Sequence, residues 1–310
     1  MKKIVALMLA LLFLIGCVKA DTVPKDRDAI SVIATIFPAY DFAREIAGDK
    51  ASVRQLLPAG SESHTYEPAP RDIIAIENCD LFICTGGEGD VWIDGILKSM
   101  GDKAPTVLKM TDCVELIEAE PMEGEHHHHG DGHRHDFDEH VWTSPKNAVK
   151  ISRAIAQKLS ETDGENEGYY SERLSNYTKK LDELDANLEG VVRAAKHDTI
   201  VVGDRFPFLY LAKHYGLRYH AAFSACGSEG DASAATIASL ADKAEELDIP
   251  AVLYIEFSNH RIADVIAETA GIKTALLHSC HNVSEEQLAD GVSYLTLMRD
   301  NIKVLSEVLN

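Results

Sequence analysis

The chain has 310 residues, of which 45% are hydrophobic and 26% are charged. This composition is typical of a globular protein and excludes a wholly disordered, collagen-like or coiled-coil chain, and the length favours roughly two domains. The 50 Asp and Glu residues outnumber the 30 Lys and Arg residues, which gives a formal net charge of −20. Because phosphate backbones are bound through Lys and Arg, this charge disfavours a nucleic acid partner and suits a protein that meets cations.

The first residues have the pattern of a targeting segment. Two lysines precede an uninterrupted apolar run over 4–15, which is too short to span a bilayer and is typical of a signal peptide. The following Leu14-Ile15-Gly16-Cys17 resembles a bacterial lipobox, in which cleavage before the cysteine leaves a lipid on its sulfur. We expect residues 1–16 to be a lipoprotein signal peptide and 17–28 a tether. Lipidation of Cys17 would make the protein extracytoplasmic and anchored to the cell membrane, whereas the alternative is a plain signal peptide.

Strands and helices alternate after the tether, which favours a parallel α/β sheet over a meander. The apolar, β-branched stretch 30–36 reads as a buried strand, and Gly or Pro ends several of the following segments. We assign residues 29–160 to an N-terminal α/β lobe. Its predicted strands are 30–36, 53–57 and 81–84, and its predicted helices are 40–47, 71–78 and 147–159.

An acidic, histidine-rich segment over 118–139 interrupts this lobe. It lacks periodicity and large apolar groups, so we expect a mobile loop. The histidines favour low-affinity capture of metal near a tighter site, and the alternative is a solvated acidic loop that binds metal only incidentally. These candidate loop ligands are His126, His127, His128, His129, His133 and His135.

Apolar residues then recur at steps of four and three from Tyr170 to Val191, which is the heptad pattern of a long helix. The alternative use of this stripe is a coiled-coil dimer. Because α/β units lie on both sides, we favour a single helix over 161–195 that links two lobes. The C-terminal lobe, 196–310, has predicted strands at 199–202, 218–223, 251–255 and 274–277, and predicted helices at 208–214, 232–246, 260–270 and 284–309.

Several metal-binding side chains are predicted to follow strands. His64 lies just past a strand, His140 closes the acidic loop, and Glu256 and His278 each end an apolar strand. Ligands of open parallel sheets bind in the crevice beyond the carboxyl ends of the strands. Imidazoles and a carboxylate gathered there would form a nitrogen- and oxygen-rich site that suits Zn²⁺, with Mn²⁺ possible if oxygen ligands dominate.

The cysteines do not form a metal or disulfide motif. No CxxC spacing occurs, and an odd number remains once Cys17 is assigned to lipid. We expect Cys79 and Cys84, which flank an apolar stretch, to be buried thiols, and one bridge remains open among the remaining cysteines: Cys79, Cys84, Cys113, Cys226 and Cys280.

Two segments carry a family resemblance. His64-Thr65-Tyr66-Glu67-Pro68 with Asp72, and Asp138-Glu139-His140-Val141-Trp142 with Pro145 and Asn147, resemble the signature segments of metal-binding ABC-transporter solute-binding lipoproteins of the zinc/manganese class. The resemblance covers about residues 30–310. It implies a rigid two-lobe clamp with a metal bound in the cleft between similar lobes, and delivery of that metal to the permease and ATPase subunits of an importer.

The resemblance also implies a partial ligand set. His64 and His140 match ligands of the N-terminal lobe, and His278 stands where the family usually has an Asp ligand. The place after the first strand of the second lobe, where the family commonly has a His ligand, has none. Asp204, His220 and Glu256 are therefore candidates for the third ligand. A His in place of an Asp favours zinc over manganese.

Two other functions fit parts of the sequence. His133-Arg134-His135-Asp136 matches the HxHxD of zinc-dependent hydrolases, but that motif needs a structured turn and here lies in low complexity. Relatives of the family were first named as adhesins, so a surface protein that binds a host ligand is the second alternative. No HExxH, nucleophile elbow or phosphate-binding glycine loop occurs, so we expect no enzyme.

Overall fold

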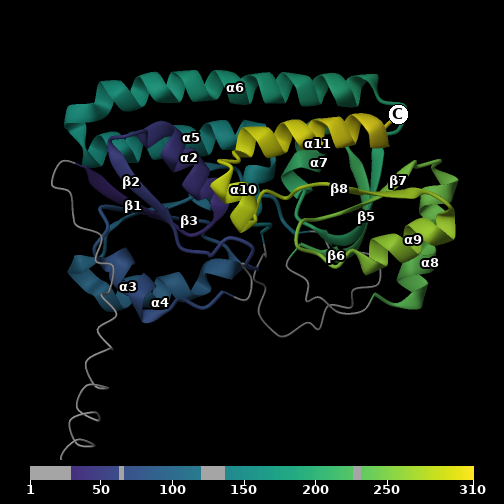
Figure 1. Ribbon diagram of the computed structural model, residues 1–310, viewed down its shortest axis with the longest axis horizontal. Coiled ribbons are helices and arrows are strands. Elements are labelled where there is room, and N and C mark those ends of the chain that lie inside the picture. Colours follow the sequence, from purple (N-terminus) through teal and green to yellow (C-terminus); the bar gives the residue numbers. More distant parts are fainter. Residues whose placement is uncertain (1–28, 63–65, 120–136, 226–231) are drawn as a thin grey trace, which may run out of the picture.

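The computed structural model describes residues 29–62, 66–119, 137–225 and 232–310, and Figure 1 shows two α/β lobes lying side by side along one long helix. Each lobe has a four-stranded sheet, with the order β2-β1-β3-β4 in the N-terminal lobe and β6-β5-β7-β8 in the C-terminal lobe. All paired strands are parallel. The predicted fold class is confirmed. The strands are β1 (Ile30–Ala34), β2 (Ala51–Gln55), β3 (Leu81–Cys84), β4 (Thr106–Lys109), β5 (Thr199–Phe206), β6 (Arg218–Ser224), β7 (Ala251–Tyr254) and β8 (Lys273–Leu276).

Helices lie on both sides of each sheet, as Figure 1 shows. This explains why the central strands are apolar on both faces: β3 is buried throughout, and so is β5. Proline at the first turn of α2, α3 and α5 fixes the backbone where each of these helices begins. The helices flanking the sheets are α2 (Phe37–Ala47), α3 (Pro70–Glu77), α4 (Val91–Met100), α5 (Pro145–Thr162), α7 (Leu209–Tyr215), α8 (Ala234–Glu246), α9 (Arg261–Ala270), α10 (Glu285–Ala289) and α11 (Tyr294–Val308).

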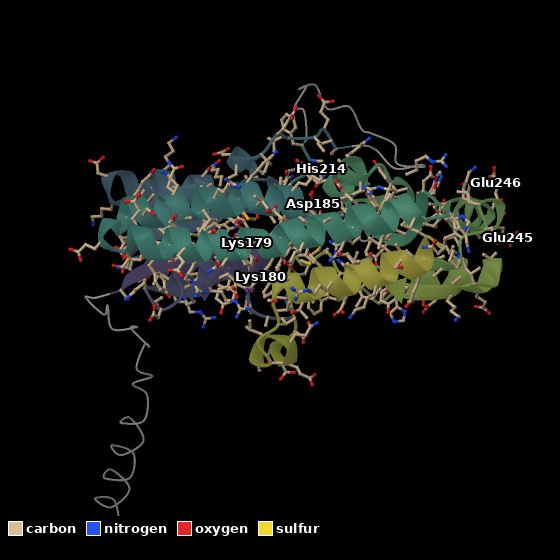
Figure 2. All side chains as sticks on the ribbon, turned by 90° about the horizontal axis from the view of Figure 1, so that it is seen from above. Lys179, Lys180, Asp185, His214, Glu245 and Glu246 are labelled. Carbon is tan, nitrogen blue, oxygen red and sulfur yellow. The ribbon has the colours of Figure 1, made fainter. Side chains whose placement is uncertain are left out.

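The predicted linking helix is α6 (Glu167–Ala194), which spans both lobes in Figures 1 and 2. At 1.5 Å per residue it is about 42 Å long. Its apolar stripe is buried within this chain, because α6 packs against α5, α2, α11 and α7. The heptad pattern therefore serves intramolecular packing, as we predicted, and not a coiled-coil dimer. The buried residues of the stripe include Tyr170, Tyr177, Leu181, Leu184 and Leu188.

The structure differs from the predicted elements in two places. Strand β4, which forms one edge of the first sheet, and helix α4, which precedes it, were not predicted. The C-terminal helix predicted as continuous over 284–309 is wrong, because it is divided into α10 and α11. The division falls at Gly291, whose φ of 73° is in the left-handed region, and Ser293 then caps α11 by accepting a hydrogen bond from the Thr296 backbone N–H.

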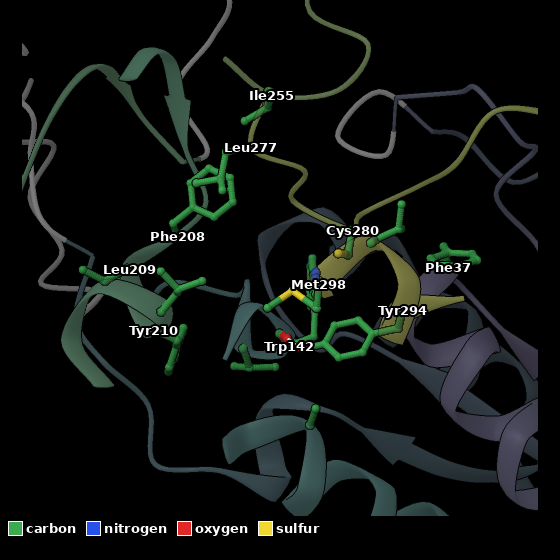
Figure 3. Close-up of a cluster of buried hydrophobic side chains, with 14 of the residues drawn as sticks. Phe37, Trp142, Phe208, Leu209, Tyr210, Ile255, Leu277, Cys280, Tyr294 and Met298 are labelled. Carbon is green, nitrogen blue, oxygen red and sulfur yellow. Dashed lines mark hydrogen bonds between the residues drawn. The ribbon is translucent and has the colours of Figure 1, made fainter. Parts of the chain in front are cut away.

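One hydrophobic core runs through both lobes (Figure 3). Trp142 of the N-terminal lobe is fully buried beside residues of the C-terminal lobe, and its indole Nε1–H donates to the Ser279 carbonyl at 2.9 Å. The hydroxyl of Tyr294, also fully buried, donates to the Trp142 carbonyl at 2.7 Å. At the other side of this contact the Tyr294 backbone N–H donates to the Asp41 carboxylate at 2.9 Å. The lobes are therefore fixed to each other by packing and by directed hydrogen bonds.

The thiols of Cys79 and Cys84 are buried and free, as predicted, and Cys113 and Cys280 are also free. Among the described residues, no helix has both the length and the apolar character needed to cross a membrane. Some predictions concern residues outside the described ranges, namely the signal peptide and tether, and the side chains of Cys17, His64, His126–His129, His133, His135 and Cys226.

Candidate metal centre

A cavity of about 380 Å³, its open mouth included, lies between the lobes. The N-terminal lobe contributes Ser61, Glu62 and His140, which follow β2 or precede α5. The C-terminal lobe contributes residues at or just after the carboxyl ends of β5, β6, β7 and β8, as expected for a ligand site on parallel sheets. These C-terminal lining residues are Arg205, Pro207, Ala225, Ile255, Glu256, Phe257, Ser279, His281 and Asn282.

His140 is held rigidly in this cavity. Its side chain is buried, and its ring Nδ1 lies 3.1 Å from Asp138 Oδ1, which also accepts the His140 backbone N–H at 2.8 Å. A carboxylate beside Nδ1 favours the tautomer with the proton on Nδ1, which leaves the lone pair of Nε2 for a metal. Burial lowers the pKa of His140, but the charge and hydrogen bond of Asp138 outweigh burial and raise the pKa above its ordinary value.

His281 is the second imidazole in the cavity. Its ring centroid is 5.4 Å from that of His140, and the two rings are nearly perpendicular. The indole of Trp142 contacts both rings, at 5.3 Å from His140 and 4.9 Å from His281. The His281 backbone is fixed on both sides, because its N–H donates to Glu256 Oε1 and its carbonyl accepts the Phe37 N–H. The two imidazoles thus share one indole wall and one cavity.

Glu256 supplies a carboxylate whose side chain is only 7% exposed. Its Oε1 accepts the Ser279 hydroxyl at 2.5 Å and the His281 N–H at 3.2 Å, and its Oε2 accepts the Ser279 N–H at 2.7 Å. These donors keep the buried carboxylate in place at the cavity wall and tie it to the loop that carries His281. Oε2 accepts only one of these bonds and retains a lone pair, so the carboxylate is also able to bind a cation.

The other predicted ligands within the described ranges do not line this cavity. His278 does not line the cavity, because its Nδ1 faces the Cys280 N–H at 2.9 Å and lies 3.5 Å from Glu256 Oε1. Asp204 lines a different cavity and accepts the N–H groups of its neighbour and of Ile255. His220 lies on β6 opposite Val201, within electrostatic range of Glu246, which Figure 2 places at the outer end of the C-terminal lobe.

A second, acidic cavity adjoins the first at His281. It is lined by Glu139, which is buried, and Asp90, which is partly buried, and both accept backbone N–H groups of the loop that follows β3. Burial raises the pKa of Asp90 to about 6 and also raises the pKa of Glu139. Within the described ranges, however, no three His, Cys, Asp or Glu side chains lie close enough together to hold an ion by themselves. A metal site in the first cavity would require its side chains to move closer together around the ion, with or without a donor from outside those ranges.

Residues 32–308 match the model of one protein family, described as "ZnuA: Zinc-uptake complex component A periplasmic". The chain belongs to the ZnuA family. The resemblance predicted from the two signature segments is confirmed, and the family is one of metal uptake and not of catalysis.

Individual relatives of the chain support its membership of the ZnuA family. The chain is 31% identical to the zinc-binding lipoprotein AdcA of Streptococcus pneumoniae over 99% of its own length, and it spans 61% of that relative. It is 31% identical to the high-affinity zinc uptake system protein ZnuA of Bacillus subtilis, over 91% of this chain and 88% of that protein. The crystal structure of the Zn(II)-bound ZnuA-like domain of S. pneumoniae AdcA matches with a TM-score of 0.75 and 28% identity, covering 91% of this chain and 99% of that domain.

Sequence reasoning missed His281 and the lining residue Arg205. The signal for His281 was a second histidine three residues after His278 in the same loop. The backbone of Cys280 between them has a φ of 62°, in the left-handed region, which turns the loop so that His281 reaches the cavity. A non-glycine residue in that conformation gives no pattern in the sequence.

Proposed function

We propose that this chain is the extracytoplasmic zinc receptor of an ABC importer, anchored to the membrane through lipid on Cys17. In this proposal it binds Zn²⁺ between its lobes and delivers the ion to the permease, which works with an ATPase subunit. The observation that supports it best is the pair of imidazoles, His140 and His281, fixed against one indole in a cavity between lobes. Imidazole is a good ligand for zinc, whereas manganese prefers oxygen.

The ligand set we propose comprises His140, His281 and the Glu256 carboxylate, completed by His64. The segment 63–65 that carries His64 follows Ser61 and Glu62, which line the cavity. In this set His278 is not itself a ligand, and its Nδ1 lies 3.5 Å from Oε1 of the Glu256 carboxylate. The site serves capture and transfer of an ion, so we expect no turnover of ester or peptide substrates.

The test is zinc affinity, measured on the full-length chain by competition with a chromophoric chelator. The parent should bind one ion tightly, and His281→Ala and His140→Ala should each weaken this site by more than about a hundredfold, because a ligand bond is lost. His220→Ala is the matched control and should bind as the parent does. Unchanged affinity in both His140→Ala and His281→Ala would contradict the proposed site.

The histidine-rich loop carries a second part of the proposal, low-affinity capture of zinc by His126–His129, His133 and His135. Deleting 124–136 should remove weak sites and leave the tight one, because the proposed ligands of the tight site lie elsewhere. Calorimetry should then show the zinc stoichiometry fall to one. Loss of the tight site in this deletion would mean that the loop supplies a ligand to it.

A further inference from the structure

Arg205 places a positive charge inside the cavity that we propose for a cation. The residue is 8% exposed, lies near the end of β5 and lines the cavity together with His140, Glu256 and His281. A guanidinium is always protonated, so it repels a divalent ion unless an anion accompanies it. Its position calls for an explanation other than direct metal binding.

The partner of Arg205 is a carboxylate from the opposite lobe. Its terminal Nη2 donates to Glu62 Oε2 at 2.8 Å, and Glu62 also lines the cavity. The pair therefore joins the carboxyl end of a strand in one lobe to the segment after β2 in the other lobe. The Glu62 side chain is 37% exposed whereas that of Arg205 is 9% exposed, so the buried guanidinium holds a partly exposed carboxylate at the cavity.

The chemistry of Glu62 makes this contact relevant to selectivity. Carboxylate oxygens are hard donors that suit Mn²⁺, Mg²⁺ and Ca²⁺, whereas imidazoles suit Zn²⁺. Glu62 is a second carboxylate at the same cavity as Glu256, and with both carboxylates available the donor set would shift from nitrogen towards oxygen. A charge-assisted bond to Arg205 competes with a metal for the Glu62 oxygens.

We propose that Arg205 is a selectivity residue, which occupies the Glu62 carboxylate and so keeps the cavity rich in imidazole and selective for zinc over manganese. Arg205 acts through Glu62 and contacts no metal itself. This inference rests on the proposed function, since it requires a divalent ion in the cavity.

The experiment compares the ratio of Zn²⁺ to Mn²⁺ affinity, measured by equilibrium dialysis of the full-length chain against both metals. In Arg205→Met the Glu62 carboxylate loses the guanidinium, and the ratio should fall by about tenfold or more, the lower range of effects from groups around a metal site. Arg218→Met is the matched control: it removes the same charge from an exposed Arg218–Asp198 pair at the start of β6. Its ratio should equal that of the parent.

A second substitution tests the route through Glu62. Arg205→Met combined with Glu62→Gln should restore the parental ratio, because the released carboxylate is gone. If the ratio stays low in the double variant, or never falls in Arg205→Met, the inference is overturned. If Arg205→Met does not melt cooperatively, Arg205→Lys replaces it in the test. This variant keeps the charge but has a single donor group, so its ratio of Zn²⁺ to Mn²⁺ affinity must also fall, by a smaller factor. A parent that binds no zinc would contradict the proposed function and the role of Arg205 with it, whereas a parent that binds zinc and an unchanged ratio in Arg205→Met would contradict only the role of Arg205.

Discussion

The cavity shows at the scale of single residues how a buried histidine becomes a good metal ligand. His140 has little access to water, so its protonation and tautomer depend on the carboxylate of Asp138, which contacts both its ring and its backbone N–H. The carboxylate orients the ring and increases the basicity of the nitrogen that remains. Asp138 is itself buried. Its backbone is held by a hydrogen bond, because the Asp138 carbonyl accepts the Tyr210 hydroxyl from the other lobe.

Replacing Asp138 by Asn should therefore weaken zinc binding by about 10- to 100-fold while leaving the fold intact, because the amide preserves shape but not charge. Asp264→Asn is the matched control, since Asp264 pairs with His260 at 2.9 Å on the exposed start of α9. Chelator competition on both variants checks this. Equal affinities in Asp138→Asn and Asp264→Asn would show that the carboxylate does not act on His140.

The sequence predicts the candidate site at this scale only in part. His140 and Glu256 were predicted as candidate ligands, and both line the cavity. His278 was predicted by the strand-end rule, which points to side chains at the end of a strand, and His281 was not predicted. The rule carries no information on a turn such as that at Cys280, and it does not reveal that Arg205 reaches across to Glu62 from the opposite lobe.

At the scale of elements, close packing between β5 and α9 depends on one glycine. A Cβ added at Gly203 would lie 2.4 Å from the Ala263 Cα and 2.7 Å from its backbone nitrogen, so the helix and strand would have to separate. Gly190, in α6, meets nothing within 4 Å. Close packing therefore requires a glycine at position 203 and does not require one at position 190, although the sequence alone does not distinguish the two positions.

The same substitution should have opposite effects at the two positions. Gly203→Ala should lower the free energy of unfolding by about 1–3 kcal/mol, because the core is overpacked. Gly190→Ala should raise it by about 0.5–1 kcal/mol, because alanine is the better helix former at an uncrowded site. Urea unfolding of both variants measures the difference. A Gly203→Ala variant as stable as the parent would contradict the close approach of α9 to β5.

Elements with strong periodicity or clear boundaries were predicted well, and those decided by tertiary context were not. The spacing of apolar residues identified α6, whose stripe is buried over most of its length. In contrast, β4 has a single buried residue, Leu108, so its pairing with β3 has little apolar signal. The break between α10 and α11 depends on Gly291, and an isolated glycine in a helical pattern is often tolerated.

At the scale of the whole molecule, a buried carboxylate joins α2 to the start of α11 across the lobes. Asp41 is fully buried, pairs with Arg44 and accepts the Tyr294 N–H. Burial raises its pKa from 3.8 to about 6, although Arg44 and the Tyr294 N–H oppose this shift. The folded protein therefore holds a proton on Asp41 in a pH range where the unfolded chain has released it.

The sign of the resulting pH dependence follows from linkage. Between about pH 4 and pH 6 the folded state binds the extra proton, so this carboxyl makes stability fall as pH rises, by at most about 3 kcal/mol. Asp41→Asn, which does not titrate, should gain stability relative to the parent from pH 4.5 to pH 7 in urea unfolding. Asp198→Asn is the control: a hydrogen bond from Arg218 lowers the pKa of the exposed Asp198, so this carboxyl is ionised throughout the range and the difference from the parent should stay constant. A constant difference between Asp41→Asn and the parent would show that Asp41 does not titrate in this range.

The positions of the aromatic side chains give the molecule an internal optical probe. The chain contains only two tryptophans, Trp92 and Trp142. Trp142 contacts both imidazoles of the candidate metal centre, and Trp92 lines the adjoining acidic cavity. An ion that enters either cavity thus changes the surroundings of an indole, and no third indole contributes background fluorescence. Emission from the unlabelled protein should report occupancy directly, and Trp142→Phe and Trp92→Phe would assign the signal to one cavity or the other.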